Sequence, residues 1–210
     1  MVRENQFKVF AKRMPLLLFF AMTATLLLVG GSLSWGALNQ TNSATQGNAI
    51  CGSTPPSSEL ILDWAYRYGS IASMKTAADT IIVGQVLSEE SFVSGHACTL
   101  IYTKYTVLVR TAMHGATAGS VISIVQTGGV LGASRQEARD DPLMSVGNVA
   151  VMFLHLNKQT GSYAILSGPE GRFPITNGLV YSLNVLYPDR PIDLPWRISG
   201  DPLDTFIAEI

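Results

Sequence analysis

The hydrophobic pattern separates an apolar N-terminal stretch from a longer region in which apolar and polar residues alternate. No charged residue occurs between Arg13 and Glu59, and residues 16–33 are predominantly apolar. Beyond residue 79, apolar residues recur with the period of two that indicates β-strands. The pattern therefore predicts a mainly β domain that follows an apolar leader.

Seven segments of the alternating region have the length and composition of strands. Along the segment 99–110, the odd-numbered residues from Ile101 to Val109 fall on one face, including Tyr105, and Tyr102 and Lys104 fall on the other. The dipeptide at residues 177–178, Asn-Gly, predicts a tight hairpin turn. The predicted strands are 80–87, 99–110, 120–126, 148–156, 162–166, 172–175 and 179–183.

Two short helices are expected at the ends of this region. In residues 59–79, apolar side chains recur every three or four positions, which predicts a helix that Gly69 divides. Near the C-terminus, Asp201 is a candidate cap and Pro202 suits a first helical turn. The apolar stripe of this second helix is expected to pack on the barrel, with docking to a partner as the alternative; it comprises Leu203, Phe206, Ile207 and Ile210.

Short strands with helices only at the ends favour a small antiparallel barrel, and an OB-like barrel or a compact sandwich fits best. We take the OB-like barrel as the predicted fold. The domain is assigned to residues 57–210, behind a polar linker at 37–58. Residues 127–147 contain Gly128-Gly129 and no clear periodicity, so we expect an irregular loop there. A long loop in a compact domain is usually functional, which makes 127–147 the first region to consider for binding.

The leader has the features of an export signal. Arg3, Lys8, Lys12 and Arg13 precede the apolar run and are opposed only by Glu4. This asymmetry predicts that the domain lies outside the cytoplasm, either secreted or anchored by an N-terminal helix. Residues 1–36 are assigned as signal peptide or signal anchor, because an 18-residue run is near the lower limit for spanning a bilayer.

Charge argues against nucleic acid as a partner. The chain has 14 basic and 15 acidic residues, and residues 1–36 hold 4 and 1 of them. The remainder carries 10 basic and 14 acidic residues, a net charge of −4. A mildly acidic domain lacks the basic surface that phosphate backbones require. The expected partners are therefore the membrane, if the leader is uncleaved, and possible protein partners.

One succession of motifs resembles known domains. It includes Ala78-Asp79 before a strand with Gly84-Gln85-Val86, a tyrosine-rich strand, and His114-Gly115. The order resembles a group of uncharacterised exported bacterial and archaeal domains. Its first half is similar to the netrin-like module of tissue inhibitors of metalloproteinases, which implies an OB-type barrel. Those inhibitors begin with Cys-x-Cys, whereas residues 51–53 here are Cys-Gly-Ser, so the resemblance extends to the barrel and not to zinc chelation.

The two cysteines, Cys51 and Cys98, are candidates for a disulfide, since export favours oxidation. Such a bond would close a loop of nearly 50 residues and stabilise the domain by roughly 3–4 kcal/mol. The alternative is a pair of unbonded thiols.

Few residues suggest catalytic or metal chemistry. Glu137, Asp140 and Asp141 are weak candidates for a hard cation, but an Asp before Pro142 equally suits a turn. The histidines show no metal-ligand spacing, and Gly-x-Ser-x-Gly is absent from the sequence. We expect no cofactor and no catalytic residues. The main interpretation is a non-enzymatic extracytoplasmic binding module of unknown ligand; the alternatives are a protease inhibitor of the metalloproteinase type and a hydrolase with a non-motif active site.

The export prediction is tested by fractionating cells and determining the N-terminus of the recovered protein by mass spectrometry. We expect the protein in a membrane or extracytoplasmic fraction, starting near residue 37 if cleaved or retaining residue 1 if anchored. Recovery only from the cytoplasm would contradict export. A start other than Cys51 would also remove the chelating mechanism of the netrin-like inhibitors.

Overall fold

The computed structural model describes residues 54–94 and 98–210, which belong to one compact unit. The predicted signal or anchor helix at residues 1–36 lies outside this described part. The strands are β1 (Ser58–Leu60), β2 (Thr80–Ser94), β3 (Leu100–His114), β4 (Val121–Leu131), β5 (Ser134–Ala138), β6 (Val149–Leu156), β7 (Tyr163–Ile165), β8 (Arg172–Thr176), β9 (Leu179–Tyr181) and β10 (Ser199–Pro202). The α-helices are α1 (Ile71–Ala77), α2 (Leu183–Leu186) and α3 (Leu203–Glu209).

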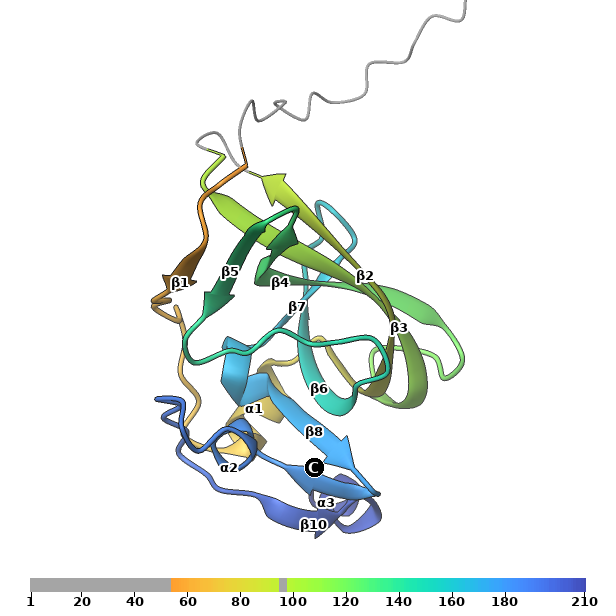
Figure 1. The fold of residues 1–210 in the computed structure, drawn as a ribbon. Helices are drawn as coiled ribbons and strands as arrows, with labels where there is room; N and C mark the ends of the chain where they lie inside the picture. The colour runs from red at the N-terminus through yellow and green to blue at the C-terminus, as the bar shows by residue number, and fades with distance from the viewer. Residues whose placement is uncertain (1–53, 95–97) are drawn as a thin grey trace, which may run out of the picture. The chain divides into compact units, whose positions relative to one another are not determined.

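Five strands close into a barrel, which confirms the mainly β prediction (Figure 1). The order around the barrel is β2, β3, β4, β7, β6 and back to β2. Four of these pairings are antiparallel, and the parallel pairing of Ile124 with Tyr163 joins β4 to β7. The interior is filled by apolar side chains of the barrel strands together with Tyr105 and Met144.

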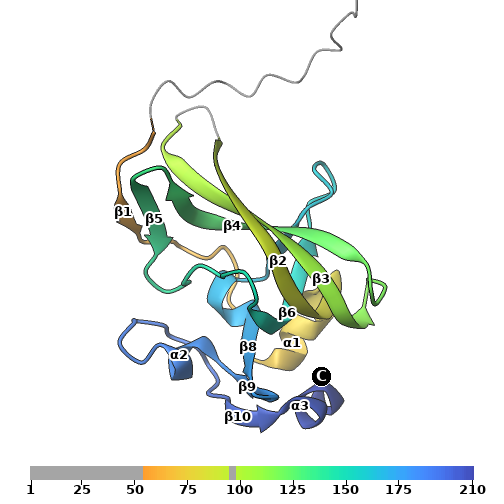
Figure 2. The ribbon, with the colours of Figure 1, turned by 45° about the vertical axis from the view of Figure 1, so that its right-hand side comes forward.

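The remaining strands extend the sheet beyond the barrel. β8, β9 and β10 follow β6, whereas β5 and β1 follow β4 at the opposite edge. A second apolar core lies on the outer face of β2 and β6, where Ile81, Val83 and Phe153 meet α1, α3 and β8 (Figure 2). Since successive strand residues point to opposite faces, β2 and β6 contribute to both cores.

The predicted alternation in β3 is confirmed. The odd-numbered residues from Ile101 to Val109 are all buried, and Tyr102 and Lys104 are more exposed. The C-terminal helix is also confirmed, although it begins at Leu203 and Asp201 lies in β10. The stripe of α3 packs on the second core through buried Phe206, as expected.

The helix predicted for residues 59–79 is wrong in its first half. Residues 58–60 form β1, which pairs in parallel with β5, and the helix begins only at Ile71. Trp64 packs so closely on Gly168 that a Cβ there would lie 2.2 Å from the indole ring. The backbone N–H of Tyr68 donates to Glu170 at 2.8 Å. These tertiary contacts override a helical periodicity that is only local.

The irregular loop predicted for residues 127–147 is largely a strand hairpin. β4 continues to Leu131, and β5 follows after a short turn. The irregular part is shorter, and we call residues 139–148 the plug loop. Met144 of this loop is buried in the barrel interior, where the Tyr105 hydroxyl donates to its carbonyl at 3.2 Å.

Gly129 offers a test of packing where β4 leaves the barrel. A Cβ at this position would lie 2.5 Å from Thr103 Oγ1, 2.6 Å from Ser91 Oγ and 2.8 Å from Ile101 Cγ2. We expect Gly129→Ala to lower the free energy of unfolding by about 1–3 kcal/mol, because the core must shift to accept a methyl group. Urea denaturation measures the change.

The matched control is Gly69→Ala, because a Cβ at Gly69 meets no atom within 4 Å. This variant should unfold at the same urea concentration as the wild type, or slightly higher. Equal stabilities for the two variants would contradict the packing described for Gly129.

Candidate functional site

An uncharged groove with aromatic walls lies on the barrel; we call it the aromatic groove. It has a volume of about 370 Å³ and is formed by β2, β3, β4, β7 and the turn between β6 and β7. Its lining residues are Phe92, Ser94, Tyr102, Val125, Thr127, Asn157, Thr160, Ser162, Tyr163 and Ala164.

Strand register places two aromatic rings together on this surface. Phe92 of β2 lies directly opposite Tyr102 of β3. Their ring centroids are 5.9 Å apart with an interplanar angle of 28°, so the rings form an offset stack. Since Ile101 and Thr103 point into the barrel, Tyr102 points outward to the groove.

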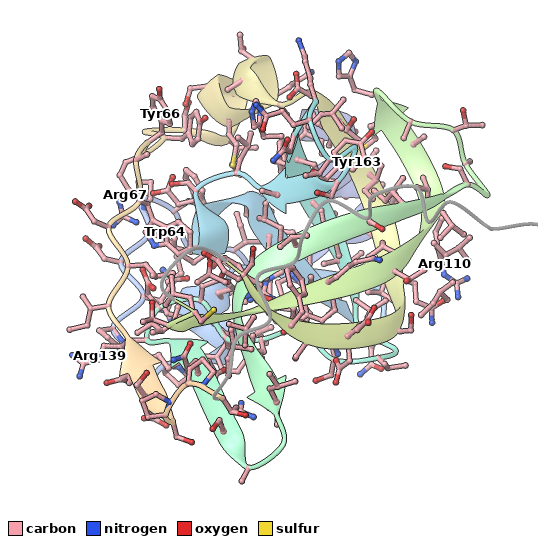
Figure 3. The ribbon with its side chains drawn as sticks, turned by 90° about the horizontal axis from the view of Figure 1, so that it is seen from above. Trp64, Tyr66, Arg67, Arg110, Arg139 and Tyr163 are labelled. Atoms are coloured by element: carbon pink, nitrogen blue, oxygen red, sulfur yellow. The ribbon has the colours of Figure 1, made fainter. Side chains whose placement is uncertain are left out.

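The third aromatic residue comes from the strand that closes the barrel. Tyr163 lies in β7, opposite Ile124 of β4, and is labelled in Figure 3. Closure therefore brings Tyr163 to the same groove as Tyr102, although the two residues are distant in sequence. Phenol rings combine an apolar face with a hydroxyl that forms hydrogen bonds.

Polar side chains of the β6–β7 turn form the remaining wall. Asn157 Oδ1 accepts hydrogen bonds from the backbone N–H groups of Gln159 and Thr160. The hydroxyls of Thr160 and Ser162 are 2.6 Å apart. The turn thus presents hydroxyl and amide groups on a backbone fixed by its own hydrogen bonds.

A larger surface hollow lies elsewhere, between β1, β5 and residues 189–191, with a volume of about 800 Å³. Most of its charged side chains already pair with one another. Arg139, labelled in Figure 3, lies 2.9 Å from Glu59. Glu137 forms ion pairs with Arg135 at 2.8 Å and with Arg190 at 3.1 Å. Because most of these charges are paired, the smaller aromatic groove is the better candidate for a ligand site.

The three acidic residues considered for a cation bind different partners. Burial raises the pKa of Glu137, but its ion pairs with arginines and the hydrogen bond from the Leu143 N–H outweigh this effect, so its pKa is lowered. Asp140 accepts a hydrogen bond from Trp64 Nε1 at 2.7 Å. Asp141 pairs with Arg172. Within residues 54–94 and 98–210, no group of three or more His, Cys, Asp or Glu side chains could hold a metal ion.

The Asp141–Arg172 ion pair lies inside the protein. The two groups are 2.9 Å apart, and their side chains are 3% and 4% exposed. Burial raises the pKa of Asp141, and the Arg172 guanidinium opposes this rise. Gln126 also holds the plug loop, because its Nε2 donates to the Pro142 carbonyl at 3.1 Å. The pair therefore anchors the plug loop.

A contact between His155 and Asp79 lies at the end of β6. His155 Nδ1 is 2.7 Å from Asp79 Oδ2, and the imidazole is mostly exposed. The Leu156 N–H hydrogen bond lowers the pKa of Asp79, burial opposes it, and His155 adds to the lowering. In the described part of the chain, His155 contacts the carboxylate of Asp79. A hydrolytic triad requires, in addition to this pair, a hydroxyl or thiol beside the imidazole.

Some predicted sites fall on residues outside the described part. Cys51, one half of the predicted disulfide, lies there, so its pairing with Cys98 stays a prediction.

The described residues form a mainly β protein with a closed five-stranded barrel, and the lining of its aromatic groove holds no charged side chain. Comparison of the chain with protein-family models, curated proteins and solved structures found no significant match. No helix in the described ranges is both long and apolar enough to cross a membrane.

Sequence reasoning identified only part of the aromatic groove. It predicted that Tyr102 points away from the Tyr105 face, which is correct, but it ended the first barrel strand at residue 87 and omitted Phe92. The signal that was missed is the length of the neighbouring strand. The tyrosine-rich strand is long, and its partner in the sheet has to be equally long. Nothing local in the sequence indicates that Tyr163 pairs with β4.

The buried ion pair predicts a large effect of one substitution. Asp141→Asn removes the charge that compensates Arg172 and leaves a guanidinium buried without its counterion. We expect the free energy of unfolding to fall by about 3–5 kcal/mol. Urea denaturation at neutral pH provides the measurement.

Glu59→Gln is the control, since it breaks the exposed pair with Arg139 and should leave stability nearly unchanged. If both substitutions had small effects, the Asp141–Arg172 pair would not anchor the plug loop as described.

Proposed function

We propose that the protein is an extracytoplasmic, non-enzymatic binding module, delivered or anchored through residues 1–36, and that the aromatic groove is its ligand-binding surface. The observation that carries the proposal is the groove lining, in which three aromatic rings lie among hydroxyl and amide groups without any charged side chain. Concave sites with apolar walls and a few polar groups are typical of ligand binding.

The order of strands supports an OB-like assignment of the barrel. A meander of three strands, β2, β3 and β4, is followed by β6 and β7, and β7 returns to lie beside β4. In OB-type barrels, ligands bind on the face of the second and third strands and at adjoining loops. The corresponding elements here are β3, β4 and the β6–β7 turn, which all line the aromatic groove.

The chemistry of the groove favours a neutral oligosaccharide. Aromatic rings such as Tyr102 and Tyr163 stack on the apolar face of a sugar ring, while Asn157, Thr160 and Ser162 offer donors and acceptors to its hydroxyls. A nucleic acid or an acidic glycan would require basic side chains, and the lining has none.

A glycan array containing neutral and acidic oligosaccharides tests this proposal with the purified full-length protein. We expect binding to neutral members of the array. The strongest of these is then titrated calorimetrically against the wild type and Tyr102→Ala. Loss of the stacking surface should weaken binding at least about tenfold, or about 1.4 kcal/mol.

Tyr66→Ala is the matched control, because Tyr66 is a highly exposed tyrosine outside the groove (Figure 3). It should bind as the wild type does. Absence of binding to every neutral glycan, preference for acidic glycans, or equal affinities for Tyr102→Ala and the wild type would each refute the proposal.

A further inference from the structure

A separate cavity lies between the plug loop, β8 and α2. It has a volume of about 240 Å³, and most of its lining residues are apolar, including Ile175, Leu183 and Leu186. Thr176 and Tyr187 also line it and are exposed, so the cavity reaches the surface. We call it the Arg172 cavity, after the one charged side chain in its lining.

Arg172 reaches this cavity from the first position of β8. Its strand neighbour is Met152 of β6, which belongs to the barrel core. The Nη2 group of Arg172 donates to Asp141 at 2.9 Å and to the Pro142 carbonyl. The rest of the guanidinium is held in a fixed plane by these two bonds.

The Nε–H of Arg172 is buried and has no acceptor among the described residues. A buried donor without a partner is unfavourable, and native structures contain few of them. Arg172 belongs to the lining of the cavity and Asp141 does not, so the cavity is the space from which a ligand group could approach the Arg172 side chain. The unpaired donor therefore indicates a ligand group that accepts hydrogen bonds.

A second polar group lies in the lining. Asn148 uses its Oδ1 to accept the Ser145 N–H at 2.9 Å, which leaves its amide NH₂ available as a donor. The lining includes no acidic side chain. Two hydrogen-bond donors and no acidic side chain in the lining favour an acceptor such as a carboxylate over an amine or a cation.

We propose that the Arg172 cavity binds a small monocarboxylate with a short apolar tail. The carboxylate accepts a hydrogen bond from Arg172 Nε, and the tail lies against Ile175, Leu183 and Leu186. The volume corresponds to about eight water molecules, so a compact ligand is required. This site is independent of the aromatic groove, because the two linings share no residue.

Hexanoate is a suitable probe, with hexanamide and hexylammonium as analogues of similar size. Titrations of the full-length protein are followed by ¹⁵N-edited NMR of the arginine Nε–H groups, and the Arg172 signal is assigned by its loss in Arg172→Lys. We expect saturable binding of hexanoate with a dissociation constant below about 1 mM. The Arg172 signal should shift, hexanamide should bind at least about tenfold more weakly, and hexylammonium should not bind.

Leu186→Trp should abolish hexanoate binding, because the indole fills the cavity without touching the ion pair. The matched variant Leu87→Trp, at an exposed leucine outside the lining, should bind as the wild type does. Thermal unfolding establishes that both variants are folded. No saturable binding, equal binding of acid and amide, or full binding by folded Leu186→Trp would overturn the proposal.

Discussion

The pairing of β7 with β4 is the contact on which the rest of this structure depends. β7 is only three residues long, yet it pairs with β6 on one side and with β4 on the other. This closure removes two sheet edges and encloses the interior that Ile124 and its neighbours fill. It also brings Tyr163 to the surface already occupied by Tyr102, so the same pairing completes the core and the aromatic groove.

The plug loop is held to the barrel by both apolar and polar contacts. Met144 supplies apolar volume, while Gln126 and the Asp141–Arg172 pair bind the loop backbone. A buried ion pair is seldom a net source of stability, but removing one partner is costly. Such a pair fixes the position of the loop, and with it the wall of the neighbouring cavity, more than it adds to the free energy of folding.

Much of the fold could be predicted because strand alternation is a local signal. The buried face of β3 and the apolar stripe of α3 follow from spacing alone. The errors arose where distant contacts decide. Residues 61–70 resemble a helix, but Trp64 and Tyr68 are held by Gly168 and Glu170, about a hundred positions away. The groove could be predicted only in part for the same reason, since Phe92 and Tyr163 reach it through strand register and closure.

The acidic residues illustrate a different limit. Glu137, Asp140 and Asp141 are close in sequence, which suggested a shared cation, but the structure gives each its own partner. Adjacent residues in an extended or irregular segment point in different directions, so proximity in sequence does not imply a common site.

The central claim is that the outer face of the closed barrel, at the aromatic groove, contacts the ligand. The most direct measurement is the mapping of backbone amide shifts when a neutral oligosaccharide is added to the ¹⁵N-labelled protein. The account predicts that the largest shifts cluster at Phe92, Tyr102, Thr160 and Tyr163. Shifts that cluster instead around the charged hollow near Arg139 and Arg190, with none in the groove, would contradict it.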